Sequence, residues 1–274
     1  MQSSFEKNMP LHGIDFTSAP SKRKPITIAS GELCQHTWHL QSLQCFPDFI
    51  SYTDWLKRPG PWLAAFDHPF SLPRELIEQI GWSQSWREMI AQYTSLSRPE
   101  IRHLFKQFCD ARAVGNKFAH RATDTPAGSS PSMKWVNPPV AYMLHAGVPP
   151  LLEAGITLFG MHSGDPQRIG LEGYPGMVAR SITRDSYKSD TRAKQTPARR
   201  FAREHILQRL EKGSYKFGIC LHAGSFRAAL LDDASGDLLD AVLCGILSAW
   251  AWQRRATRYG MPSFDPLEGW IVGA

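Results

Sequence analysis

The sequence predicts a single α/β domain built on a mixed sheet of five strands flanked by helices, and three observations carry that prediction. Short apolar runs between turn residues near the N-terminus predict an antiparallel meander of strands. A continuous apolar run at residues 62–67 is typical of a buried parallel strand. A strongly apolar helix at residues 237–254 must be largely buried.

The five predicted strands span residues 12–17, 26–30, 33–40, 62–67 and 168–173. The first three form the meander, with turns in the basic, proline-bounded segment 18–25 and at Ser30-Gly31. The last two strands each end in an acid that precedes a proline-containing turn.

Helical periodicity and capping residues predict helices in much of the remaining chain. Ser97-Arg98-Pro99-Glu100 is a capping box with proline in the first turn, so a helix begins there. The predicted helices span residues 47–57, 74–80, 86–93, 98–112, 140–145, 151–156, 176–182, 197–210 and 237–254. Residues 113–137 show no periodicity and predict a long loop whose basic residues face solvent or phosphate.

This order of elements divides the single domain into three parts. The core comprises residues 11–69 and 166–260, and a mostly helical insertion spans residues 70–165. Residues 261–274 form a tail, and the polar residues 1–10 are expected to be frayed.

Composition is that of an ordinary globular protein, with 42% hydrophobic and 20% charged residues. The 31 Lys and Arg residues exceed the 25 Asp and Glu residues, and the net charge of +6 suits an anionic partner such as nucleic acid. The five cysteines form no CxxC pair and have no spacing typical of zinc sites. Their odd number, with several inside apolar runs, indicates reduced thiols in a cytoplasmic protein with no disulfide partner. No stretch resembles a signal peptide or reaches transmembrane length, so no membrane partner is expected.

Carboxylates lie at or near the ends of three of the predicted strands, at Asp15, Asp67 and Glu172. A carboxylate at the tip of a central strand lies where an open α/β sheet binds its ligands. For Asp67 an alternative interpretation is that the side chain only caps the turn before the proline-containing loop.

Two further carboxylates, Asp237 and Asp240, lie on one side of the first turn of the last helix. Acids in a first turn complement the helix dipole, which accounts for Asp237. Apolar residues surround Asp240 in the sequence, and a buried carboxylate costs several kcal/mol unless it is paired or bound to a metal. Asp240 is therefore a candidate metal ligand.

The element order is that of the ribonuclease H-like fold, in which acids from the first strand, a central parallel strand and the last helix converge on divalent metals. The chemistry explains the residue types. Two Mg²⁺ ions neutralise the charge that develops during phosphodiester hydrolysis and produce hydroxide near neutral pH. Because Mg²⁺ keeps several waters, a few carboxylates are enough to hold it.

The sequence also resembles the domain-of-unknown-function family 429, whose members are predicted nucleases with a ribonuclease H-like fold. The matching stretches are Gly13-Ile14-Asp15-Phe16, Phe66-Asp67-His68-Pro69-Phe70-Ser71-Leu72-Pro73, Glu172-Gly173-Tyr174-Pro175, Gly236-Asp237-Leu238-Leu239-Asp240-Ala241 and Leu267-Glu268-Gly269-Trp270-Ile271. The motif at residues 237–241 is also similar to the last acidic motif of Holliday-junction resolvases. One departure concerns Glu172, because the glutamate of this fold usually comes earlier in the chain.

The function expected from these features is phosphodiester hydrolysis that depends on Mg²⁺ or Mn²⁺. Asp15, Asp67 and Asp240 are the expected metal ligands, while Glu172 and Asp237 either bind the metal or position water. The candidate substrate-binding residues are Lys22, Arg23, Lys188, Arg192 and Lys194, which would contact a nucleic acid.

Two alternatives come from other functional classes. In a non-catalytic nucleic-acid-binding or scaffold protein with the same fold, these acids would have only a structural role. An actin-like sugar kinase also begins with a Gly-Ile-Asp strand, but it needs a second half with a glycine-rich phosphate turn after an Asp strand. No such Asp-x-Gly-x-Gly turn occurs here.

Overall fold

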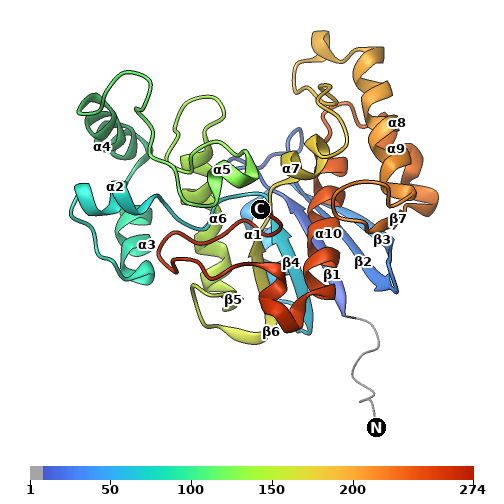
Figure 1. Cartoon of the computed structure of the whole chain (residues 1–274), viewed down its shortest axis with the longest axis horizontal. Helices are drawn as coiled ribbons and strands as arrows, with labels where there is room; N and C mark the ends of the chain where they lie inside the picture. The colour runs from blue at the N-terminus through green and yellow to red at the C-terminus, as the bar shows by residue number, and fades with distance from the viewer. Residues whose placement is uncertain (1–8) are drawn as a thin grey trace.

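A computed structural model describes residues 9–274 of the chain. The predicted frayed N-terminus lies largely outside these residues, and Pro10 already opens the first strand. Figure 1 shows a central sheet with helices on both of its faces. The fold is of the α/β class, as the sequence predicts.

The sheet has seven strands among the described residues, not the predicted five, in the order β5-β6-β4-β1-β2-β3-β7. Their bounds are β1 Pro10–Asp15, β2 Ile26–Cys34, β3 Thr37–Phe46, β4 Trp62–Phe66, β5 Ile156–Leu158, β6 Asp165–Glu172 and β7 Cys220–His222. The two unpredicted strands, β5 and β7, are three residues long and lie at the two edges. Strands this short contain too few residues to give a recognisable alternation.

The strand directions bring the acidic strand ends together. β1, β2 and β3 form the predicted antiparallel meander, while β4 is parallel to β1 and β6 is parallel to β4. The carboxyl ends of β1, β4 and β6 therefore lie at one edge of the sheet. Asp15, Asp67 and Glu172 stand at or directly after these ends.

The prediction of the second turn of the meander at Ser30-Gly31 is wrong. β2 continues to Cys34, and the chain reverses at Gln35, which has a positive φ of 55°. The β2–β3 register shifts between Ser30 and Gly31, and a Cβ on Gly31 would lie 2.2 Å from the carbonyl oxygen of His39. The glycine therefore marks an irregularity inside a strand rather than its end.

The predicted helices occur in the predicted order, with one pair merged into a single helix and two short helices added. Their bounds are α1 Phe49–Leu56, α2 Arg74–Gln79, α3 Trp86–Ser95, α4 Arg98–Asp110, α5 Asp124–Ala127, α6 Val140–Glu153, α7 Pro175–Arg180, α8 Pro197–Glu211, α9 Arg227–Asp232 and α10 Asp237–Gln253. The added helices are α5, in the segment predicted as a loop, and α9. The prediction of two short helices at 140–145 and 151–156 is wrong, because α6 runs on through Pro149 and Pro150. Its buried apolar face, which includes Leu144 and Val148, offsets the hydrogen bonds that the prolines cannot make.

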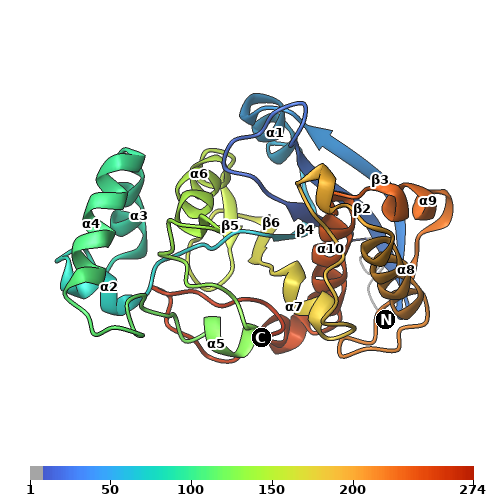
Figure 2. The same ribbon diagram turned by 90° about the horizontal axis from the view of Figure 1, so that it is seen from above.

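Two hydrophobic cores lie on the two faces of the sheet. Leu63 and Ala65 of β4 belong to the core that includes residues of α7, α8, α9 and α10, whereas Ala64 and Phe66 belong to the core with α1 and α6. Figure 2 shows α1 and α10 on opposite sides of the strands. Within residues 9–274, no helix has the length and apolar character needed to cross a membrane.

Candidate carboxylate site

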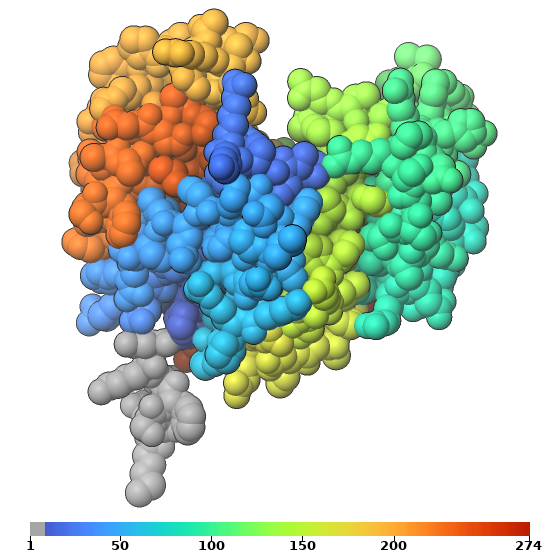
Figure 3. All heavy atoms as spheres, turned by 180° about the vertical axis from the view of Figure 1, so that it is seen from behind, coloured from blue at the N-terminus to red at the C-terminus, as the bar shows by residue number. Residues whose placement is uncertain are grey.

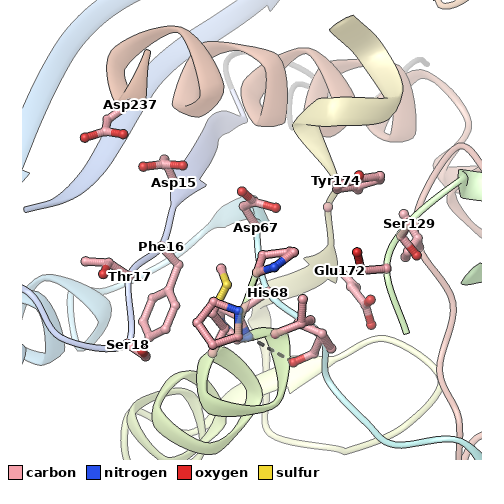
Figure 4. A pocket seen from close by; sticks show the side chains of 18 of the residues that line it. Asp15, Phe16, Thr17, Ser18, Asp67, His68, Ser129, Glu172, Tyr174 and Asp237 are labelled. Carbon is pink, nitrogen blue, oxygen red and sulfur yellow. Dashed lines mark hydrogen bonds between the residues drawn. The ribbon is translucent and has the colours of Figure 1, made fainter. Parts of the chain in front are cut away.

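A pocket of about 370 Å³ opens at the edge of the sheet where β1, β4 and β6 end. Its lining includes Asp15, Asp67, Glu172, Asp237 and Lys188, which are five of the ten residues predicted to form the site, while Asp240 lies buried behind the lining. Figure 3 shows the surface hollowed between the lobe that carries α8 and the lobe that carries α4. Figure 4 shows the labelled side chains around the pocket.

Strand pairing places Asp15 beside Asp67. Ile14 and Phe66 are partners in the parallel β1–β4 ladder, and the backbone N–H of Asp67 donates to the carbonyl of Ile14 at 2.9 Å. Because side chains alternate along a strand, Asp15 shares the face of Gly13, and that face is covered by α10. Figure 4 shows the two carboxylates below this helix.

Asp15 and Asp67 have no hydrogen bond or ion pair from their carboxylates to any other described residue. Asp15 is only 6% exposed. Burial, followed by the charge of Asp240, raises the pKa of Asp15 well above its usual range. The same two causes raise the pKa of Asp67 to about 7. The charge of Lys188 lowers both pKa values but does not cancel these shifts, so the two carboxylates remain electrostatically unfavourable without a further cation.

The packing of α10 on β1 brings Asp240 into the same group. The hydroxyl of Ser248 donates to the carbonyl of His12 at 2.6 Å, which ties the helix to the strand. A Cβ on Gly245 would lie 2.1 Å from the ring of Trp38, so the glycine lets the helix pack tightly against the buried indole. One turn earlier in this helix, Asp240 faces Asp15, and the two charges repel each other.

Unlike Asp15 and Asp67, the carboxylate of Asp240 is fully satisfied. The hydroxyl of Tyr187 donates to its Oδ1 at 2.5 Å, and the ammonium of Lys188 forms an ion pair with its Oδ2. Asp240 is completely buried, whereas the Lys188 side chain is 43% exposed. The lysine thus reaches from the protein surface to a buried anion. Burial opposes its charge, but Asp240 raises the pKa of Lys188 well above its usual range.

Asp237 also has a lysine partner. Lys24, in the loop between β1 and β2, donates to Asp237 at 2.8 Å and to the exposed Asp190 at 2.6 Å. Burial raises the pKa of Asp237, while the charge of Lys24 opposes that effect. The four aspartates therefore divide into an unpaired pair, Asp15 and Asp67, and a lysine-bound pair, Asp237 and Asp240.

Glu172 lines the pocket but faces away from the aspartates. Its strand partner is Phe66, whose ring lies in the core on the other side of the sheet from α10. The Glu172 carboxylate accepts two hydrogen bonds from the guanidinium of Arg121, at 2.6 and 2.8 Å, and one from the backbone N–H of Phe70 at 3.0 Å. Arg121 also pairs with the buried Asp124 at 3.0 Å. Figure 4 shows Glu172 on the far side of Asp67 from Asp15.

The other predicted substrate-binding residues do not line the pocket, although each lies within four positions of Lys24 or Asp190, which do. Lys22 and Arg23 are exposed on the loop between β1 and β2. Arg192 and Lys194 are exposed in a single 3₁₀ turn, Arg192–Lys194, on the segment that follows Lys188. Of the five, only Lys188 forms an ion pair with a site carboxylate.

Sequence reasoning missed three residues that organise the site. Lys24 is one of several basic residues in a turn, and nothing in its spacing separates it from Lys22 or Arg23. Tyr187 has no recognisable motif. Arg121 belongs to the unpatterned loop, where solvent exposure is the ordinary expectation, yet it is only 2% exposed.

The chemistry of the donors fits a hard divalent cation. Across residues 9–274, no group of three or more His, Cys, Asp or Glu side chains is arranged so that it could hold a metal ion. Mg²⁺, however, keeps several waters and is often held by one or two carboxylates. Asp15 and Asp67 supply two unpaired carboxylates beside a pocket. These two residues would hold the ion, with water completing its coordination.

Searches of family models, curated proteins and solved structures give no match to this chain.

Proposed function

We propose that this protein is a divalent-metal-dependent phosphodiester hydrolase acting on nucleic acid, a nuclease with Mg²⁺ or Mn²⁺ as cofactor. The observation that carries the proposal is the unpaired state of Asp15 and Asp67 at the edge of a pocket. Buried carboxylates without partners are costly, and an ion bound between them removes that cost.

The topology supports a ribonuclease H-like fold. An antiparallel meander is followed by two strands parallel to its first strand, and the last long helix packs on that strand. Asp15 ends the first strand, Asp67 directly follows the next parallel strand, and this helix supplies Asp237 and Asp240. With the motifs quoted above, this arrangement supports placing the chain in the domain-of-unknown-function family 429.

Each group in the site has a separate task in such a reaction. Asp15 and Asp67 hold the ion, which when bound lowers the pKa of a water and neutralises charge on the phosphate. Lys188 and Lys24 place positive charge at the pocket, where it attracts a phosphate group. Arg121 and Glu172 fix the loop and strand that form one wall.

Basic residues around the pocket support a polyanionic substrate. Lys22 and Arg23 lie on one loop, and a second group lies on the lobe carrying α8: Arg192, Lys194, Arg199 and Arg200. Each phosphate neutralised by such a residue adds salt-dependent affinity. We therefore expect binding of oligonucleotides to weaken steeply as salt increases.

The experiment that tests the proposal is cleavage of labelled single-stranded DNA, double-stranded DNA and RNA in Mg²⁺ or Mn²⁺. Asp15→Asn and Asp67→Asn should each lower the rate at least about 100-fold, because each loses half of the ion-binding pair. Asp110→Asn is the control, since Asp110 is about half exposed, pairs with Lys106 on α4 and does not line the pocket. Metal-independent cleavage, or equal rates for all three variants, would contradict the proposal.

A second candidate function is a non-catalytic nucleic-acid-binding protein. The lysine pairing of Asp237 and Asp240 favours it, because those two carboxylates are neutralised without any metal. Oligonucleotide binding that needs no metal, without cleavage of any substrate in the panel, would support this candidate.

A further inference from the structure

Three aspartates line the pocket and Asp240 is buried beside them, and these four carry unequal numbers of partners. Both carboxylate oxygens of Asp240 are occupied, by Tyr187 and by Lys188, and Asp237 accepts from Lys24. Asp15 and Asp67 accept from no described residue. Only two of the four carboxylates are therefore free to take an ion without first losing a partner.

Lys188 is held in place by several contacts. Gly236, directly before α10, has a positive φ of 80°, and a Cβ there would lie 2.6 Å from the Cβ of Lys188. The absence of that Cβ lets the aliphatic chain of Lys188 cross the start of α10 and reach Asp240. A lysine side chain that simply extended into solvent would not require a residue without a Cβ at position 236.

A buried arginine positions the segment that carries Lys188. Arg203 of α8 is 3% exposed, and its guanidinium donates to the carbonyl of Tyr187 at 2.7 Å and to that of Leu231 at 2.9 Å. Ser189 continues the attachment, since its N–H donates to the carbonyl of Ala234 at 3.1 Å. The residues on both sides of Lys188, Tyr187 and Ser189, are thus held in place by hydrogen bonds to their backbones.

The charges at the pocket balance with one divalent ion. When all four aspartates are ionised, as binding of a cation requires, they carry four negative charges, and Lys24 and Lys188 together supply two positive charges. The remaining two negative charges are those of Asp15 and Asp67, and they equal the charge of a single Mg²⁺. A second divalent ion would have to displace Lys188 from Asp240.

We propose that the site binds one divalent ion, at Asp15 and Asp67, and that the Lys188 ammonium on Asp240 takes the place of a second ion. This inference rests on the proposed function, and it makes Lys188 a catalytic residue that contacts the phosphate group of the substrate. Lys188 stays an ammonium group and offers N–H donors and positive charge to the non-bridging oxygens. Tyr187 and Arg203 are positioning residues, because they act through Asp240 and Lys188.

Metal stoichiometry tests the inference without measuring cleavage. Mn²⁺ is titrated into the metal-free protein, and bound ions are counted by calorimetry and by the electron paramagnetic resonance signal of free Mn²⁺. The wild-type protein should bind one ion per chain. Lys188→Met keeps the aliphatic chain over Gly236 and frees an oxygen of Asp240, so it should bind two ions. Lys188→Arg should bind one.

Two further variants complete the test. Lys194→Met removes the same charge from the same segment, with no site carboxylate as its partner in the described chain, and should bind one ion. Asp240→Asn should also bind one ion, because Asp240 is not a ligand in this arrangement. If Lys188→Met does not fold, the wild-type and Asp240→Asn stoichiometries decide the question.

The outcomes separate this inference from the proposed function. Two ions on the wild-type protein, or a loss of binding in Asp240→Asn, would overturn the role of Lys188 and leave a metal-dependent nuclease intact. A stoichiometry of one in Lys188→Met would also overturn it. No binding to the wild-type protein would overturn both.

Discussion

Gly13 of β1 lies directly against the backbone of α10 at Gly245. A Cβ on Gly13 would lie 2.0 Å from the backbone nitrogen of Gly245 and 2.1 Å from the carbonyl oxygen of Ala241. Both obstacles are backbone atoms, so no rotamer change relieves them. This contact brings the first turn of the helix, with Asp240, over the strand end that carries Asp15.

Gly13→Ala should therefore destabilise the protein and open the site. The helix must move away from the strand, which we expect to lower the free energy of unfolding by about 3 kcal/mol, the upper end for overpacking. Urea denaturation measures the change. Gly81→Ala is the control, because a Cβ there meets nothing within 4 Å and only the left-handed backbone, φ 72°, is strained. Equal losses for both variants would contradict the packing argument.

Asp240→Asn should keep the fold and lose activity. If a buried arginine were the partner of Asp240, the substitution would strand a buried cation at a cost of about 3 kcal/mol or more. The partner is Lys188, whose side chain is 43% exposed and can turn to water. We expect a loss of stability near 1 kcal/mol and a cleavage rate lower by about 100-fold. Thermal melting and the cleavage assay measure the two effects.

Tyr187→Phe is a milder companion to Asp240→Asn. It removes one hydrogen bond to Asp240 and keeps the Lys188 ion pair, so most of the activity should remain. If Tyr187→Phe were as inactive as Asp240→Asn, the result would contradict a catalytic role for the Lys188 ammonium.

Metal-free protein should become less stable as pH rises from about 4 to 7. The pKa of Asp67 is raised to about 7 in the folded protein, and its value in an unfolded chain is near 4. The folded state therefore holds the proton more tightly, and the stabilisation present below pH 4 is lost as pH rises through 7. The midpoint of thermal unfolding, measured against pH, should fall across this window. Asp67→Asn should flatten the decrease.

Added Mn²⁺ should reverse the trend above pH 7, because the ion binds the ionised carboxylates of the folded protein and raises the melting temperature by mass action. A melting temperature that is indifferent to millimolar Mn²⁺ would favour the non-catalytic candidate. A pH dependence unchanged in Asp67→Asn would mean that other groups cause it.

Arg121→Met should be among the most destabilising single changes in the chain. The variant leaves the buried Glu172 and Asp124 without their shared partner, which we expect to cost about 3–5 kcal/mol. Arg227→Met is the control, because its pair with Glu211 is about one-third exposed and should contribute less than about 1 kcal/mol. Chemical denaturation compares the two. A similar small loss in both would contradict a structural role for the Arg121 network.

Local sequence patterns were enough to locate the elements that carry the aspartates. The apolar run before Asp67 is β4, and the apolar helix that opens with Asp237 is α10, ending at Gln253. The capping box at the start of α4 has both of its expected hydrogen bonds. In each case residues that are neighbours in the chain determine the outcome, because backbone hydrogen bonds within a helix and burial along a strand are local.

The partners of the acids were decided by the tertiary structure. The pairs Lys188–Asp240 and Arg121–Glu172 join residues 52 and 51 positions apart, and nothing in their spacing indicates contact. Glu172 turns from the aspartates because its register with Phe66 sets its face of the sheet, and register depends on strands distant in sequence. The sequence alone determined which acids stand at the strand and helix ends. Which of them remain free for an ion follows from long-range packing, because packing alone brings a lysine or an arginine to a particular carboxylate.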